Sequence, residues 1–256
     1  MIKFLLKGLL RDKSRSRLPV LVVTIGVTLT VLMHAYITGF MGDIIEINAR
    51  FSYGHLKVMT RGYADNMRQS PNDLALLNVS SLIDDLKEQY PGTEWSPRIQ
   101  FAGLVDIPDE NGETRSQGPA AAMGLELLAQ GSAEIKRMNF VKSLVRGQMP
   151  SKQNEVLLSD EFSRKLGVNP GDRITFISST MNGSMSITNF VLAGTVSMGH
   201  EALDKGTLIA DIQDARNALD MEDSAGEILG FLKGGFYIDE VARSEAEKFN
   251  SASSVN

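Results

Sequence analysis

The longest apolar run in the chain lies near its N-terminus and has the length of a membrane-spanning helix. Residues 18–41 are 24 positions without Asp, Glu, Lys or Arg. As an α-helix rising about 1.5 Å per residue, the run would measure roughly 36 Å, against a hydrocarbon core of about 30 Å. Several threonines dilute the run, but their hydroxyls can bond to the preceding helical turn. The pattern predicts a helix that is long enough to cross a membrane.

Two alternatives to a membrane anchor are a cleaved secretion signal and the core helix of a soluble fold. A signal peptide needs small residues at a cleavage site after a short apolar core. The sequence His-Ala-Tyr-Ile at residues 34–37 offers no such site. A buried core helix would gain nothing from the cations that flank this run. We therefore interpret residues 18–41 as a transmembrane helix.

Charge is distributed unevenly on the two sides of this helix. Residues 1–17 carry six Lys or Arg side chains and a single Asp, a net charge of +5. Since the whole chain has a net charge of -5, residues 18–256 carry -10. Because Lys and Arg are retained on the cytoplasmic side, the N-terminus is expected in the cytoplasm and the acidic part outside. The chain shows no basic, aromatic-rich pattern, which argues against nucleic acid as a partner.

The first 17 residues have a helical pattern of their own. Apolar side chains recur at helical spacing, with cations largely between them. The apolar positions are Ile2, Leu5, Leu6, Leu9 and Leu10. A basic amphipathic helix lying on the inner leaflet fits this pattern, and an extension of the spanning helix is the alternative.

Beyond the predicted span, the sequence alternates between helix and strand patterns. Residues 42–54 have isoleucines among charged residues and predict a helical stalk. Residues 109–112, Asp-Glu-Asn-Gly, predict a hairpin turn between two strands. In the first half we expect a strand at 55–60, a polar loop at 61–78, a helix at 80–90, strands at 99–107 and 114–124, and a mixed loop-and-helix region at 125–139.

The second half gives clearer signals for the ends of elements. Gly167 is placed to end a helix, and Asp211 to begin one. We expect a strand at 155–158, a helix from 159 or 160 to 166, a turn at 169–172, a hairpin of 173–179 with 186–196, a strand at 206–210, a helix at 211–219, strand pieces at 226–233 and 235–238, and a helix at 239–249. This mixture predicts an α+β domain with two lobes over residues 55–256.

Catalytic and metal-binding patterns do not emerge from the sequence. There is no cysteine, which excludes disulfides and thiolate sites. The phosphate-binding loop, the serine-hydrolase elbow and the His-Glu-x-x-His motif are all missing. The histidines, His34, His55 and His200, are scattered. We therefore expect no catalytic residue, no metal site and no cofactor, and an envelope hydrolase is the least favoured class.

Two regions of the sequence carry a resemblance to a known family. The first is Thr-Gly-Phe at 38–40, followed by Tyr-Gly-His-Leu-Lys-Val at 53–58. The second is RGQMPSKQNEVLLSDEFSRKLGVNPGDRITF at 146–176, continued by NFVLAGTVSMG at 189–199 and DKGTLIADIQDARNAL at 204–219. In this order they resemble the permease subunits of the MacB/FtsX-like superfamily of ABC transporters, which includes the lipoprotein-releasing (Lol-type) permeases.

The resemblance implies a non-catalytic membrane subunit with a MacB-like periplasmic domain, located in the bacterial inner membrane. Its partners would be a separate cytoplasmic ATP-binding subunit and a second permease copy, in a homo- or heterodimer. Motion driven by ATP would pass through the first helix to the periplasmic domain and expel a substrate or regulate an envelope partner. The alternative function is a single-span anchored periplasmic binding or scaffold protein that works without an ATPase.

The chain departs from the family pattern after its predicted domain, because no further apolar span precedes Asn256. We expect it to be a fragment of a longer protein, and a truncated form that cannot couple to an ATPase is the alternative. Glycine and phenylalanine at 39–40 and the run at 54–56 favour the lipoprotein-releasing group, whose cargo carries acyl chains. The candidate contacts for a lipoprotein, lipid or envelope-protein substrate, or equally for a sister helix, are Phe40, Met41, Ile44, Ile45 and Ile47.

Overall fold

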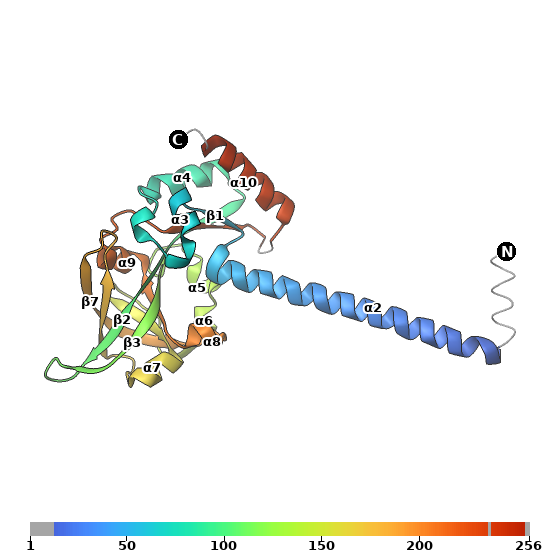
Figure 1. The fold of residues 1–256 in the computed structure, drawn as a ribbon, viewed down its shortest axis with the longest axis horizontal. Helices are drawn as coiled ribbons and strands as arrows, with labels where there is room; N and C mark the ends of the chain where they lie inside the picture. The colour runs from blue at the N-terminus through green and yellow to red at the C-terminus, as the bar shows by residue number, and fades with distance from the viewer. Residues whose placement is uncertain (1–12, 235–236, 254–256) are drawn as a thin grey trace. The chain divides into compact units, whose positions relative to one another are not determined.

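The computed structural model describes residues 13–234 and 237–253 (Figure 1). The chain divides into two compact units, which join in sequence between Asn48 and Ala49. Most of the basic N-terminal segment predicted at 1–17, namely residues 1–12, lies outside the described residues. We call the second unit, which begins at Ala49, the body.

The first unit contains one long helix, α2 (Lys13–Asn48), which continues well past residue 41. Its apolar side chains are exposed, as on a helix made for a lipid environment. The Thr30 hydroxyl donates a hydrogen bond to the Gly26 carbonyl at 2.9 Å, so this threonine does satisfy its polar group within the helix. By length and composition, the helical stretch Arg17–Tyr53 can cross a membrane, and an 18-residue window within it has a mean hydropathy of 2.1.

The body is a mixed α/β unit, as the sequence predicts. Its strands are β1 (Leu56–Val58), β2 (Thr93–Pro108), β3 (Thr114–Leu125), β4 (Leu144–Gly147), β5 (Glu155–Ser159), β6 (Arg173–Ser179), β7 (Met185–Val196), β8 (Thr207–Asp211) and β9 (Glu227–Leu232). Its helices are α3 (Arg61–Asp65), α4 (Val79–Gln89), α5 (Glu134–Arg137), α6 (Phe140–Ser143), α7 (Asp160–Leu166), α8 (Glu201–Asp204), α9 (Ile212–Leu219) and α10 (Asp239–Ser253). Shorter turns are the π-helix η1 (Ala49–Tyr53) and the 3-10 helices η2 (Met67–Gln69) and η3 (Asn72–Leu74).

Six of the strands close into a ring. Around it, β2 pairs with β3, β3 with β8, β8 with β5, β5 with β7, β7 with β6, and β6 returns to β2. The β3–β8 and β5–β7 pairs are parallel and the others antiparallel. Strand β2 is long enough to pair with two strands in succession. Its first part pairs with β9 and its later part with β6. Closure leaves β1 and β4 as the outer strands of the described sheet.

The main hydrophobic core fills the interior of the ring and extends to buried side chains of α4, β1 and β9, and helices lie at the two open ends of the ring. Alternate side chains of the strands point inward, including Val105, Phe176 and Leu158, which are fully buried. Helix α7 packs near the start of β3 and α9 near its end, and Figure 1 shows them at opposite ends of the ring. A Cβ on Gly124 would lie 2.5 Å from the Cβ of Ala215 on α9, so only glycine fits there.

A second apolar cluster covers the outside of the ring. It joins the outward side chains of four strands to the segment that carries α5 and α6. Phe51 from the first turn of the body packs against this cluster. Its buried members are Met123, Leu125, Leu127, Met138, Phe140, Leu157, Val196 and Ile209.

Most predicted elements of the body are confirmed. Helix α4, the hairpins β2–β3 and β6–β7, and the β5–α7 unit ending at Gly167 (φ 70°) lie within a few residues of their expected places. The Asp211 side chain accepts a hydrogen bond from the Gln213 N–H, as expected of a helix cap. The division of residues 55–256 into two lobes stays a prediction.

Three expectations about elements were wrong. Strand β2 begins at Thr93 rather than 99, because residues 93–98 pair with β9; the side chains of this stretch, including Arg98, are buried except for Glu94. The polar loop expected at 61–78 contains α3, η2 and η3, and β4 was not expected. Of the strand piece expected at 235–238, residues 237–238 form no strand and 235–236 lie outside the described residues.

One buried carboxylate in α9 makes the stability of the body depend on pH. Asp214 is 1% exposed, and its Oδ1 has no hydrogen-bond partner. Its Oδ2 accepts a hydrogen bond from the Asn154 N–H at 2.8 Å. Burial raises the pKa of Asp214 to about 6, and this outweighs that hydrogen bond. The folded state therefore holds this proton at pH values at which the unfolded chain has released it.

We expect the unfolding free energy to fall as pH rises through this window, and Asp214→Asn to remove that fall. Relative to wild type, the variant should gain about 1.5 kcal/mol between pH 5 and pH 7 in urea titrations. Asp160→Asn is the control. Burial opposes ionisation of Asp160, but hydrogen bonds from Thr195, Arg164 and Arg146 lower its pKa to about 2, so its offset should be constant in this range. Parallel curves for wild type and Asp214→Asn would contradict the assignment.

Candidate functional site

The body begins with the π-helical turn η1, and this turn is the candidate functional site. In η1, the Gly54 N–H donates to the Ala49 carbonyl at 2.8 Å, a step of five residues instead of the four of an α-helix. Gly54 has a φ of 61°, and a Cβ there would lie 2.7 Å from the Leu56 carbonyl oxygen. We call residues 49–58, from this turn to the end of β1, the junction.

Arg98, from the early part of β2, holds the end of this turn. Its Nη1 donates to the carbonyl oxygen of Arg50 at 2.8 Å and to that of Phe51 at 3.4 Å. The last carbonyls of a helix have no partner within the helix, so an arginine can satisfy them. Arg98 is 1% exposed, which makes it the largest fully buried side chain of the described residues.

A buried acid neutralises this arginine. Glu134 on α5 is 0% exposed, and its Oε2 accepts from Arg98 Nη2 at 2.9 Å. Arg137 also donates to Glu134, and it reaches Glu94 at 3.0 Å. Burial lowers the pKa of Arg98, and the negative charge of Glu134 opposes that effect. The ion pair therefore joins β2, α5 and the junction at one point.

Aromatic and polar contacts extend this cluster to β9. The Arg137 guanidinium lies 3.8 Å from the centre of the Phe231 ring. Lys57 of β1 binds Glu227 of β9 at 2.6 Å and lies over the Tyr53 ring. These contacts add to the backbone pairing of β1 with β9 and fix the course of the chain as it leaves the π turn.

His55 also belongs to the junction, in a structural role. It is 9% exposed, and its Nδ1 accepts from the Leu232 N–H at 3.0 Å. Its ring lies edge-on to those of Phe231 and Tyr237. The imidazole therefore anchors the start of β1 to the end of β9. Among the described residues, no group of His, Cys, Asp or Glu is arranged to hold a metal.

The sequence analysis missed Arg98, Glu134 and Arg137. Arg98 lies between Pro97 and Ile99 in a run that was not expected to be strand, and its charge resembled that of a surface residue. The available signal was a single cation among apolar positions, since a buried charge requires a nearby opposite charge. The acid that pairs with it lies 36 residues further along the chain. Patterns of neighbouring residues do not predict a pairing over that separation.

The predicted contact residues lie together on α2. Phe40, Met41, Ile45 and Ile47 are exposed, and Ile44 is half-buried. Their spacing places Phe40, Ile44 and Ile47 along one stripe of the helix, with Met41 and Ile45 beside it. Tyr36 lies one helical turn before Phe40, and the two rings stack with their centroids 6.1 Å apart. Their role as a substrate or partner contact stays a prediction.

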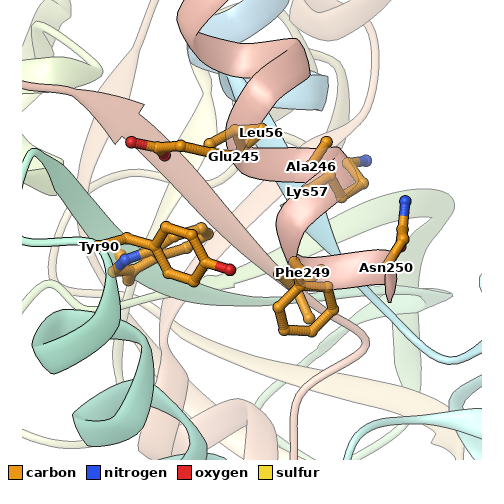
Figure 2. Close-up of a pocket in the computed structure, with 9 residues that line it drawn as sticks. Leu56, Lys57, Tyr90, Glu245, Ala246, Phe249 and Asn250 are labelled. Carbon is orange, nitrogen blue, oxygen red and sulfur yellow. The ribbon is translucent and has the colours of Figure 1, made fainter. Parts of the chain in front are cut away.

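A pocket lies between α10 and the sheet (Figure 2). Its empty volume is about 340 Å³, including space open to solvent. Figure 2 shows the Tyr90 hydroxyl pointing toward Phe249 of α10. Glu245 on α10 accepts from the Thr93 hydroxyl at 2.9 Å, which holds the helix to β2. The lining is Leu56, Lys57, Val58, Tyr90, Trp95, Glu245, Ala246, Phe249 and Asn250. The residues that line this pocket include no group arranged for catalysis. The pocket is best described as incompletely filled space between α10 and the sheet.

The sequence stretch at 146–176 has a structural centre of its own. Arg146 of β4 donates through Nε to Asp160 Oδ1 at 2.7 Å and through Nη2 to Ser163 Oγ at 3.0 Å. The Thr195 hydroxyl donates to the same carboxylate oxygen at 2.7 Å. This network ties β4 and β7 to the start of α7. These contacts hold elements of the fold together. We therefore interpret the sequence signal of this stretch as one of fold and not of a reactive site.

A double-mutant cycle tests the energetic coupling of Arg98 with Glu134. Glu134→Gln leaves the buried Arg98 without its acid, and we expect it to cost about 3–5 kcal/mol of unfolding free energy. The double variant Arg98→Met/Glu134→Gln should be less destabilised than the two single losses added together. The exposed pair Lys205–Glu201 is the control, and Lys205→Met should cost less than about 1 kcal/mol. Additive losses at Arg98 and Glu134 would show that the pair is uncoupled.

Comparison with known proteins bears on the fold. No protein-family model and no curated protein sequence matches the chain. Among solved structures, it is similar to the periplasmic region of MacB from Actinobacillus actinomycetemcomitans, with a TM-score of 0.51 and 15% sequence identity over 77% of this chain and 82% of that chain. At this identity the likeness is one of fold. The chain thus combines a long apolar N-terminal helix with a mixed α/β, sheet-rich fold like that of the MacB periplasmic region.

Proposed function

We propose that this chain is a membrane subunit of a MacB/Lol-type ABC transporter, in which a separate cytoplasmic ATPase supplies the energy and this subunit acts outside the membrane. The observation that carries the proposal is the likeness of its fold to the MacB periplasmic region, at a TM-score of 0.51. The family that the sequence resembles builds such subunits from a first transmembrane helix followed by a periplasmic domain. The subunit itself performs no catalysis.

In this proposal the apolar helix crosses the bacterial inner membrane with its N-terminus in the cytoplasm. The net charge of +5 on residues 1–17 supports that direction, because Lys and Arg are retained inside. The divisions 1–17, 18–41, 42–54 and 55–256 then correspond to a cytoplasmic segment, the span, the stalk and the periplasmic domain. A second permease copy would supply the partner helix.

The junction gives the proposal a physical route for motion. In the sequence η1 follows α2 directly, and Arg98 donates to the Arg50 and Phe51 carbonyls of η1. Because Arg98 belongs to β2 and pairs with Glu134 of α5, a displacement of η1 would act directly on both elements. A merely tethered domain would not need a fully buried charge at this point, since such a charge is costly.

A lipoprotein released from the inner membrane is the proposed cargo. The apolar side chains of Phe40, Met41, Ile44, Ile45 and Ile47, exposed except for the half-buried Ile44, support contact with acyl chains or with a sister helix. Both contacts would remove this apolar surface from water, since α2 itself provides no cover for it.

Purification from native membranes tests the coupling to an ATPase. We expect the tagged full-length protein to bring down an ATP-hydrolysing subunit in stoichiometric amount. The ATPase rate of the reconstituted complex should fall at least several-fold with Arg98→Met and stay within about twofold with the surface variant Lys205→Met. Recovery from native membranes without any ATPase would favour the anchored scaffold instead.

Site-specific photo-crosslinking tests the contact stripe. A photoreactive side chain at Ile44 or Ile47 should capture cargo lipoprotein or the partner permease. The matched control is Gly42, about 200° around the helix from Ile44, where an added Cβ meets nothing within 4 Å. Capture of the partner alone at both positions, never of cargo, would exclude the lipid-contact role.

A further inference from the structure

The π turn leaves one hydrogen-bond acceptor out of its usual pairing. In an α-helix, the Gly54 N–H would donate to the carbonyl four residues earlier, which belongs to Arg50. Here it reaches one residue further, to Ala49, at 2.8 Å. The Arg50 carbonyl is occupied instead by Arg98 Nη1, also at 2.8 Å. Arg98 and Gly54 thus compete for the same oxygen atom.

The neighbouring carbonyl shows the same pattern. The α-helical partner of Phe51 would be the His55 N–H, but that group donates to the Gly230 carbonyl of β9 at 2.8 Å. Arg98 Nη1 lies 3.4 Å from the Phe51 oxygen and supplies a donor in its place. Without Arg98, two partly buried carbonyls of the turn would lack a partner, which is unfavourable.

We propose that Arg98 sets the hydrogen-bond register of the turn between helix and body, so that the turn has two states. While Arg98 holds the Arg50 carbonyl, the turn is π-helical. When Arg98 withdraws, the Gly54 N–H takes that carbonyl, and the turn becomes α-helical. Arg98 is then a positioning residue, and Glu134 keeps its charge neutralised in the buried state.

A change of one residue in register has a defined size. In α-helical geometry it corresponds to about 100° of helical phase and about 1.5 Å of rise between the residues before and after the turn. Small displacements are converted into discrete ones when the structure has two arrangements. The inference rests on the proposed function, because a switch of register matters only if motion passes along the helix.

Single cysteines can report the register, because the chain has none of its own. Ala49 is 4% exposed and Asn48 is exposed. With the full-length protein in lipid nanodiscs, Asn48→Cys should react with a water-soluble maleimide at least about tenfold faster than Ala49→Cys. In the Arg98→Met background, where methionine keeps the bulk but donates nothing, this ratio should fall toward one, because position 49 leaves its buried place.

Two controls separate a change of register from general unfolding. Arg137→Met removes another partner of Glu134 without touching the turn, and it should leave the ratio unchanged. A cysteine at Ala218, 3% exposed on α9, should stay unreactive in every background. An unchanged ratio in Arg98→Met overturns the inference, and so does a reactive cysteine at 218, because Arg98 would then hold the body together and not the register. The labelling needs no ATPase, so its outcome is independent of the coupling experiment.

Discussion

The structure depends on a fully buried ion pair at the point where the chain enters the body. Removing an arginine from water is so unfavourable that its neighbours must supply an acid and several acceptors. Glu134 and the carbonyls of Arg50 and Phe51 supply partners to Nη1 and Nη2, while the buried Nε has none. The requirement fixes α5 against β2 and fixes the end of the helical turn against both. The outer apolar cluster, against which Phe51 packs, lies on elements whose relative positions this ion pair fixes.

The ring of strands complements this point of attachment. Its pairings return to β2, so no ring strand can slide without breaking hydrogen bonds on both sides. Arg98 lies in the part of β2 that pairs with β9, just ahead of the part that belongs to the ring. A load applied at the junction therefore reaches a strand that is continuous with a rigid framework. This combination supports the proposal that the subunit transmits displacement.

The sequence predicted the elements whose signals are local. The Gly167 helix end, the Asp211 cap and the hairpin turns each depend on residues next to them in the chain, and they are found in place. The closure of the ring, the early start of β2 and the Arg98–Glu134 pair depend on partners far away in sequence. A charged residue that is buried against a distant acid is indistinguishable, in a pattern, from one on the surface. For that reason the apolar residues of α2 and the run at 53–58 were singled out from the sequence, and Arg98, Glu134 and Arg137 were not.

The pairing of β2 with both β9 and β6 affects the order in which the body folds during synthesis. The first residue of β2, Thr93, pairs with Leu232 of β9, and 139 positions of chain separate them. Such distant pairings make folding slow, because a large loop must close before the contact stabilises anything. The early half of β2, with Arg98 in it, remains without one neighbour until almost the whole body has been synthesised. The body must therefore remain incompletely folded during most of its biogenesis, and a chaperone that shields β2 would act during that interval.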